Sequence, residues 1–572
     1  MEMATFGAKE SLLNSSSSRH STTTTHQGAS SMRAERRRNL GGIRTLQQKT
    51  SSSTKMSFDE QSGNLWLDAS LDARFQKAKK VGTWYSRTWH FLQTFSLIIF
   101  VGMLGSLWGV GLDYVMDSMN HIRETISCVG GNDDTNCLPT CDCIPSPFNA
   151  NKTISTPGTN AGSWLAYFAW SCLLLLSGFI IANIVSLTAV GSGIPRMKSV
   201  LNGTHIHHFL SLRTLLAKSI GLILVYSSGL PIGREGPYVH LSCCIAIMLM
   251  RTPIYRRYLK SSARRIDMLT VAMSTGVSAA FGTPFGGVIF AVEVVSQYFY
   301  VPNLPRMFLA SLSGTFIVKM LRSGNDPATF VALFKTSFTS ETTILTMGSI
   351  TLILSIGIVC GILSGIFVRL ISKIVQLRKN YAPSPTTNFK KYMLYFGLFA
   401  VGACLANCLV VYLFWGNFSS LRTQRSLINR LFLPGNDLNS LWWELGLLLL
   451  ANFLLTAVCI TLPIPAGLFI PVLVIGALTG RVCAGIVCSS SIGMECTTIF
   501  GYEPGVYAVV GAAAFAAGAT RAISTALIVT SITGQFHLLL PISLGVLASY
   551  FVANRISKPA YDSLIEANRC VF

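Results

Sequence analysis

Long apolar tracts alternate with short polar or basic runs from residue 91 to residue 552. A helix needs about 20 apolar residues to span a bilayer. Five tracts are that long: 91–111, 164–190, 344–376, 392–415 and 441–461. Seven more are short or interrupted by Gly and Pro: 214–226, 238–250, 268–281, 285–300, 468–478, 506–517 and 523–533. The pattern predicts an all-α, multi-pass membrane protein.

Composition supports this class of protein. Half of the residues are hydrophobic, only 12% are charged, and the mean hydropathy is +0.50, whereas a soluble chain carries roughly 25% charged residues. The formal charge of +21 comes from basic runs between apolar tracts, which is typical of cytoplasmic loops. No aromatic-basic module accompanies these runs, so we expect a lipid bilayer and no nucleic acid as partner.

Residues 1–84 are polar, basic and of low complexity, which predicts a disordered cytoplasmic tail. No apolar stretch near Met1 resembles a signal peptide, so we expect the first membrane helix to direct insertion. The loop 117–162 then lies outside. Its candidate disulfide cysteines are Cys128, Cys137, Cys141 and Cys143. Their CxC spacing also suits zinc, but we favour disulfides because the loop is expected to be extracellular.

Glycosylation sequons offer a second indicator of topology. Asn151-Lys-Thr153 lies in the same cysteine-rich loop, and Asn417-Phe-Ser419 is expected to face the same side. Both N- and C-termini are expected to be cytoplasmic.

The interrupted helices point to a transport site, because irregular backbone at membrane depth occurs where it is buried in protein or lines a cavity. The alternative is that these interruptions only reflect loose packing of the helices by small residues. An internal repeat in the sequence favours the transport site. GLPIGREGP (229–237) is similar to TLPIPAGLFIP (461–471), and GVSAAF (276–281) to GAAAF (511–515). Two matches at nearly one offset predict duplicated halves, 85–330 and 331–572.

Each copy contains a Leu-Pro-Ile, a turn of small residues and a helix start marked by proline. A helix N-terminus offers unpaired N–H groups and a partial positive charge, so two such ends would form an anion site. Gly233, Gly236 and Gly467 would let the backbone approach the anion closely. A third break contributes the Ser192 hydroxyl. Glu235 places a carboxylate where the anion would lie.

These breaks resemble the three filter motifs of the CLC family of chloride channels and proton-coupled chloride exchangers, in the family's order. The motif residues are Gly191, Ser192, Gly193, Ile194 and Pro195; Gly233, Arg234, Glu235, Gly236 and Pro237; and Gly467, Leu468, Phe469, Ile470 and Pro471. The resemblance runs from about residue 85 to 568 and includes GTPFGGVIFAVEV (282–294) and SKPAYDSLI (557–565). It implies a homodimer with one pore per subunit, built from inverted repeats of tilted and re-entrant helices.

Carried over residue by residue, the resemblance implies roles for five positions. The Ser192 hydroxyl, the Tyr561 phenol and the backbone N–H groups of Leu468 and Phe469 would bind the central anion, and Glu235 would be the gating glutamate. Tyr561 alone could equally be an interfacial tyrosine. Chloride would be the transported ion, and no cofactor is implied.

Exchangers of the family need a second protonatable group, and that position falls on Val294, which cannot bind a proton. We therefore expect a voltage-gated chloride channel of the plasma membrane. The alternative is a proton-coupled exchanger that uses the neighbouring Glu293. A membrane-embedded metalloenzyme built on His205, His207 and His208 is the distant alternative.

The sequence departs from the family at Arg196, where an acid is usual, and at Ser531, where a glutamate is usual. Arg196 would either concentrate anions at the inner mouth or reflect a changed loop salt bridge. We expect no CBS domains after Tyr561.

Overall fold

The computed structural model describes the compact unit that begins at Asp72, over residues 84–127, 143–146, 149–155, 161–295 apart from 205, 301–323, 346–414 apart from 384, 386 and 387, 423–433, 442–490 and 502–568, together with 334, 336 and 338. Every structural statement below concerns these residues. Cys128, Cys137, Cys141, Asn417 and the tail 1–83 lie outside them.

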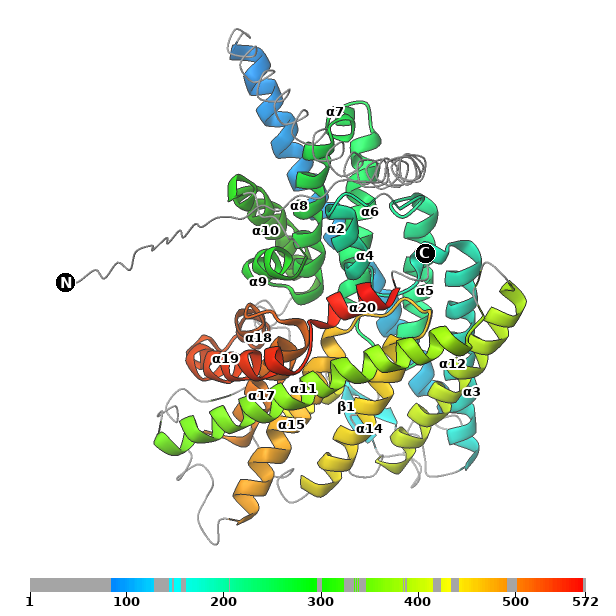
Figure 1. Cartoon of the computed structure of the whole chain (residues 1–572), viewed down its shortest axis with the longest axis vertical. Helices are drawn as coiled ribbons and strands as arrows, with labels where there is room; N and C mark the ends of the chain where they lie inside the picture. Colours follow the sequence, from blue (N-terminus) through cyan, green and yellow to red (C-terminus); the bar gives the residue numbers. More distant parts are fainter. Residues whose placement is uncertain are drawn as a thin grey trace, which may run out of the picture. The chain divides into compact units, whose positions relative to one another are not determined.

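Helices account for nearly all of this structure (Figure 1). The first half contains α2 (Trp84–Ser127), α3 (Ala161–Val185), α4 (Ile194–Leu201), α5 (Leu212–Ser227), α6 (Glu235–Arg251), α7 (Arg256–Lys260), α8 (Ser262–Phe281), α9 (Pro284–Phe290) with the π-helical turn η3 (Ala291–Val295), and α10 (Leu304–Ser323). The second half contains α11 (Met347–Tyr381), α12 (Phe389–Leu413), α13 (Gln424–Leu431), α14 (Trp442–Ile460), α15 (Phe469–Ser490), α17 (Pro504–Thr520), α18 (Thr525–Thr533), α19 (Leu539–Ile556) and α20 (Ala560–Asn568). Short 3₁₀ turns are η2 (Leu187–Ala189), η4 (Val301–Asn303) and η7 (Phe536–Leu538).

Eight of the described helices are long and apolar enough to cross a membrane, so the multi-pass, helical prediction is confirmed. Each of the five long tracts predicted from the sequence overlaps one of these helices over most of its length. α10 and α19 were missed as spans, and α15, whose apolar part is Phe469–Val487, was predicted only as the short segment 468–478. α10 carries Pro305, Arg306 and Lys319, and its best window has the lowest mean hydropathy of the eight, 1.2.

One small departure from an all-α fold lies in the loop 117–162. Strands β1 (Cys143–Ser146) and β2 (Asn149–Ser155) pair as an antiparallel hairpin. Cys143 therefore lies on β1 and the sequon residue Asn151 on β2. A polar loop between two membrane helices can form local backbone pairs without changing the helical architecture.

The interrupted segments lie inside the protein. The apolar window of α15 is 78% buried, against 33–50% for the other seven spanning helices, and every residue of α17 is buried. α15 and α17 lie side by side through glycines: a Cβ on Gly476 would come 2.3 Å from the Gly511 carbonyl oxygen. Small residues thus allow α15 and α17 to pack closely.

Candidate functional site

The two Leu-Pro-Ile breaks meet in the middle of the protein. Gly233 and Gly467 form an isolated antiparallel bridge in which the Gly233 N–H donates to the Gly467 carbonyl (2.8 Å) and the Gly467 N–H donates to the Gly233 carbonyl (2.7 Å). α6 begins two residues after Gly233, at Glu235, and α15 begins two residues after Gly467, at Phe469. The bridge therefore fixes two helix N-termini beside each other.

The Glu235 carboxylate lies over this bridge. A Cβ built on Gly233 would be 2.3 Å from Glu235 Oε2, and one built on Gly467 would be 3.0 Å from the same atom. Glu235 is 3% exposed, and neither carboxylate oxygen makes a hydrogen bond of ordinary geometry. Backbone N–H groups of Arg234, Glu235 and Ile470 nevertheless face it. The carboxylate thus occupies the space toward which both helix N-termini point.

The first motif reaches the same place. The Gly191 N–H donates to the Ile464 carbonyl in the second Leu-Pro-Ile (3.0 Å). Gly193 has φ +93° and precedes α4, whose first turn contains Ile194 and Pro195. The Ser192 hydroxyl oxygen is buried without a hydrogen-bond partner, and a Cβ on Gly236 would come 1.9 Å from it. Only glycine at position 236 lets this hydroxyl lie against the first turn of α6.

A buried lysine, which the sequence analysis did not identify, holds the backbone of the first motif through hydrogen bonds. Lys218 on α5 is 1% exposed, and its ammonium donates to the carbonyls of Gly191 (2.8 Å) and Ala189 (3.2 Å). It therefore holds the backbone on both sides of Val190, immediately before Ser192 in the chain.

Tyr561 approaches from the C-terminal helix. Its side chain is 2% exposed and lies near enough to Glu235 for an electrostatic interaction. α20 contacts both α4 and α11 (Figure 1), and the Lys198 ammonium on α4 pairs with the Asp562 carboxylate on α20 (2.5 Å). The Tyr561 helix is thus attached to the helix that follows Ser192.

Leu468 and Phe469 lie at the start of α15, on the remaining side of the candidate site, and both are 1% exposed. Their N–H groups belong to the helix end whose amides have no intrahelical partner. The Phe469 ring packs edge-on against Phe281 and Phe290, with centroids 4.9 and 5.4 Å away. This aromatic packing fixes the start of α15.

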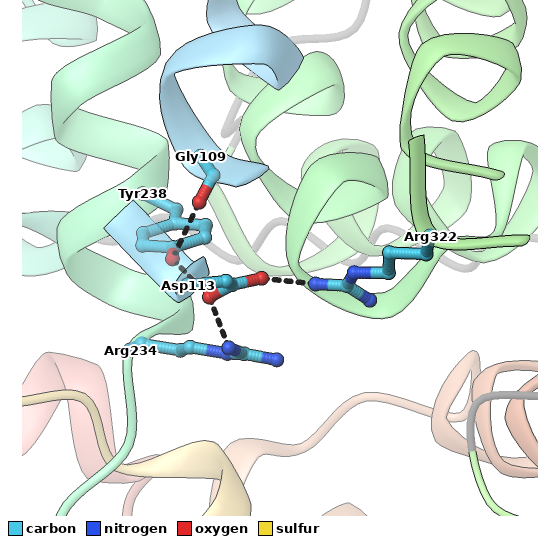
Figure 2. A network of polar contacts seen from close by, with 5 residues as sticks. All are labelled: Gly109, Asp113, Arg234, Tyr238 and Arg322. Carbon is cyan, nitrogen blue, oxygen red and sulfur yellow. Dashed lines mark hydrogen bonds and ion pairs between the residues drawn. The ribbon is translucent and has the colours of Figure 1, made fainter. Parts of the chain in front are cut away.

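Arg234 pairs with an acid on another helix (Figure 2). Its guanidinium binds the Asp113 carboxylate on α2, which also binds the Arg322 guanidinium on α10 and lies against the Tyr238 hydroxyl. Asp113 and Arg234 are both 4% exposed. Arg234 therefore has a carboxylate partner other than Glu235.

Val294 and Glu293 lie in the π-helical turn after α9. Val294 is buried. The Glu293 carboxylate accepts hydrogen bonds from the backbone N–H groups of Ile523 (2.7 Å) and Ser524 (2.9 Å), immediately before α18. Glu293 thus caps the start of α18, and Ser531 lies later on that helix, half-buried.

A cavity of about 630 Å³ opens beside the first motif. Gly191, Ser192 and Gly193 line one side, and Arg196, Arg378 and Lys379 contribute the charged side chains. Arg196 also donates to the carbonyls of Leu187 (3.3 Å) and Thr188 (3.2 Å). Arg196 therefore lies in the wall of a cavity that Ser192 also lines, and both readings of Arg196 stay predictions.

Comparisons with known proteins identify this arrangement. Residues 173–554, about two thirds of the chain, match the family model described as voltage gated chloride channel. Human chloride channel protein 2 is 33% identical over 442 residues, which are 72% of this chain and 49% of that protein. The chloride channel protein of Tetronarce californica is 32% identical over 440 residues, 71% of this chain and 53% of the relative. The chain spans about half the length of these curated relatives.

Solved structures agree on the fold. A crystal structure of a eukaryotic CLC transporter matches with a TM-score of 0.65 and 28% identity, covering 84% of this chain and 75% of the other. A slow cyanobacterial Cl⁻/H⁺ antiporter matches with a TM-score of 0.63 at 20% identity, covering 84% of this chain and 98% of the other, and supports the fold alone. The chain belongs to the family of voltage gated chloride channels, the CLC family of anion channels and transporters.

Proposed function

We propose that this protein is a voltage-gated chloride channel in which Glu235 is a tethered anion that competes with chloride for the permeation site. One observation carries the proposal: the Glu235 carboxylate lies over the Gly233–Gly467 bridge, facing amides from the starts of both α6 and α15. Its neighbour Arg234 is already paired with Asp113.

The site suits an anion that must also leave quickly. Each helix N-terminus presents unpaired N–H groups and roughly half a positive charge. Such dipoles attract chloride without the tight binding of a direct lysine or arginine contact, and conduction needs sites that release the ion as well as bind it. The Ser192 hydroxyl and the Tyr561 phenol would complete the coordination, together with the amides of Leu468 and Phe469.

We expect gating to arise because the Glu235 carboxylate and chloride compete for the same position in the pore. An ionised Glu235 would fill the position of an anion, so raising external chloride or lowering external pH should displace or neutralise it and open the pore. Membrane voltage acts on the same charges, at about 2.3 kcal/mol per elementary charge per 100 mV when the whole field is crossed.

Two side chains favour a channel over an exchanger. Val294 cannot accept a proton at the position where exchangers of the family have their inner acceptor. Glu293, which the exchanger alternative needs, is engaged as the cap of α18 through two backbone hydrogen bonds. The relatives named as chloride channels support the same reading.

A reversal-potential measurement separates these two activities. At fixed chloride, an imposed proton gradient should leave the reversal potential at the chloride equilibrium value. A reversal potential that moves with the proton gradient would establish exchange, and Glu293→Gln would then test whether Glu293 is the acceptor.

The proposal includes the molecule's organisation. We propose a homodimer of the plasma membrane with one pore per subunit, repeats at 85–330 and 331–572, cytoplasmic termini and the loop 117–162 outside. Chloride flux through the purified protein also tests the metalloenzyme alternative. His207 and His208, the described histidines of that alternative, lie in a polar turn between α4 and α5, so we expect chloride flux not to depend on them.

A further inference from the structure

Arg521 ends α17 in a backbone conformation that residues other than glycine rarely adopt. Its φ is +61° and its ψ is 35°, in the left-handed region, and its N–H donates to the Ala517 carbonyl (2.8 Å). α8 and α18 end in the same conformation, at Gly282 and Gly534. A Cβ is unfavourable in this region, so an arginine here indicates that its side chain has a use of its own.

The Arg521 side chain reaches the segment that leads to Tyr561. Its Nη2 atom donates to the carbonyls of Ala553 (2.5 Å) and Ser557 (2.8 Å), and to the Ser557 hydroxyl (3.1 Å). Ala553 lies in the last turn of α19, and Ser557 is the residue that follows this helix. α20 begins at Ala560, and Tyr561 is its second residue. Arg521 therefore holds the chain four residues before Tyr561.

The backbone that follows Arg521 is itself held in place. The Glu293 carboxylate accepts hydrogen bonds from the N–H groups of Ile523 and Ser524, and every residue of α17 before Arg521 is buried. The guanidinium thus extends from a loop that is fixed at both of its ends. Its hydrogen bonds transmit this fixed position to the segment between α19 and α20.

α20 has one other polar attachment described above, the pair between Lys198 and Asp562. The Asp562 side chain is 36% exposed, and ion pairs that solvent reaches contribute little. The bonds of Arg521 are hydrogen bonds from a charged donor in a partly buried place, and such bonds are stronger than neutral ones. We expect Arg521 to be the firmer of the two attachments.

We propose that Arg521 is a positioning residue for the anion site: it holds the end of α19 and Ser557, and so fixes the place of the Tyr561 phenol. It would act through Tyr561 and not by contact with the anion. Its effect on permeation rests on the proposed function, because Tyr561 is assigned to the anion site there. The place of the Tyr561 ring can be measured without any transport.

The consequence for permeation follows from the geometry of a hydroxyl donor. A hydrogen bond weakens steeply when the donor is misaligned with its acceptor. Without Arg521, the start of α20 would be free to shift, and the phenol would no longer meet every anion with one fixed geometry. Anions that differ in size and shape, such as chloride and nitrate, would then be discriminated differently.

Fluorine NMR of the full chain tests the place of Tyr561 independently of transport. With 3-fluorotyrosine at position 561 alone, the otherwise wild-type protein should give one narrow resonance. The resonance should broaden or split in Arg521→Gln, stay single in Arg521→Lys, and be unchanged in Arg555→Gln, at an exposed arginine in the last turn of α19. Several resonances in the wild-type background, or an unchanged one in Arg521→Gln, would overturn the proposal.

A second variant covers the case in which Arg521→Gln does not fold. Arg521→Gly suits the left-handed backbone and also lacks the guanidinium, so it removes the hydrogen bonds without adding backbone strain. The fluorine resonance should broaden or split in this variant as well. A narrow, unshifted resonance in folded Arg521→Gly would overturn the proposal.

Permeability ratios test whether Arg521 acts through Tyr561. Arg521→Gln should change the nitrate-to-chloride ratio from bi-ionic reversal potentials by about twofold, the size expected for one weakened hydrogen bond, and Arg521→Lys should restore it. In a Tyr561→Phe background, Arg521→Gln should have no further effect, because the hydroxyl that it positions is absent. Equal effects with and without that hydroxyl would show that Arg521 is only a structural residue.

The two proposals fail in different ways. Absence of any chloride current in wild type would refute the proposed channel function, while the fluorine resonance still decides whether Arg521 fixes Tyr561. A normal wild-type current with equal permeability ratios in Arg521→Gln and Arg555→Gln would refute the role of Arg521 in the anion site.

Discussion

Gly233 and Gly467, 234 residues apart in the chain, exchange two backbone hydrogen bonds of 2.8 and 2.7 Å. This pairing holds the starts of α6 and α15 beside each other and leaves the Glu235 carboxylate lying over both glycines. The position of the proposed gate thus depends on a contact between the two predicted repeats.

Gly467→Ala should disrupt that contact, because a Cβ there would come 2.9 Å from both the carbonyl carbon and the oxygen of Gly233. Overpacking against backbone costs about 1–3 kcal/mol, so we expect a lower thermal midpoint in detergent and reduced chloride flux. Gly397→Ala on α12 is the control, since a Cβ there meets nothing within 4 Å. Equal midpoints and fluxes in the two variants would contradict the role of the bridge.

Ser192→Ala and Tyr561→Phe should each change anion permeability ratios while leaving a folded dimer. Each removes one hydroxyl from the proposed site, a loss of about 0.5–1.5 kcal/mol. Bi-ionic reversal potentials with chloride, bromide and nitrate measure the effect. Ser118→Ala, at an exposed hydroxyl on α2, should leave the ratios unchanged. Unaltered ratios in both single variants and in the double variant would show that the filter lies elsewhere.

Asp113→Asn should destabilise the protein and disturb gating, since it leaves Arg234 and Arg322 without their shared carboxylate. Breaking a buried ion pair in this way costs about 3–5 kcal/mol. Thermal unfolding and the voltage of half-activation are the measurements. Arg322→Gln, which leaves the Asp113–Arg234 pair intact, should be milder and can be recorded if Asp113→Asn fails to fold. Asp117→Asn, one turn further along α2 and exposed, is the control, and an equal effect there would argue against the network.

Single-sequon variants test the proposed topology. A chain that retains only Asn151 should carry glycosidase-sensitive mass, because the loop 117–162 is proposed to be extracellular. A chain that retains only the sequon Asn202-Gly-Thr204, at the end of α4, should carry none, because we propose that this end of α4 is cytoplasmic. Sensitivity of the Asn202-only chain, assayed by gel shift after expression in cells, would require the opposite orientation.

The sequence was sufficient to predict the broken helices and their meeting point. Pro and Gly interrupt the apolar tracts where α4, α6 and α15 begin, and these residues have strong local conformational preferences. The assignment of Ser192, Glu235 and the start of α15 to one anion site came from the internal repeat and the resemblance to the CLC family, and that role stays a prediction.

Contacts between distant helices were not predictable in the same way. Asp113 lies 121 residues before its partner Arg234, and no local pattern distinguishes it from the exposed Asp117. Arg378 belongs in the sequence to a run of basic residues, and only the folded structure brings its guanidinium to the rings of Phe396 and Phe399 on α12. The span α10 was missed because its charged residues find partners in the folded protein, as Arg322 does with Asp113.

The central claim is that Glu235 is the gate, and patch-clamp recording of Glu235→Ala tests it most directly. Currents should be largely independent of voltage and insensitive to external pH, because no tethered carboxylate remains to compete with chloride. Glu566→Gln, at an exposed carboxylate paired with Lys558, should gate like wild type. Glu235→Gln should also stay mostly open, since it resembles the protonated acid. Intact voltage and pH dependence in a well-expressed Glu235→Ala channel would contradict the account.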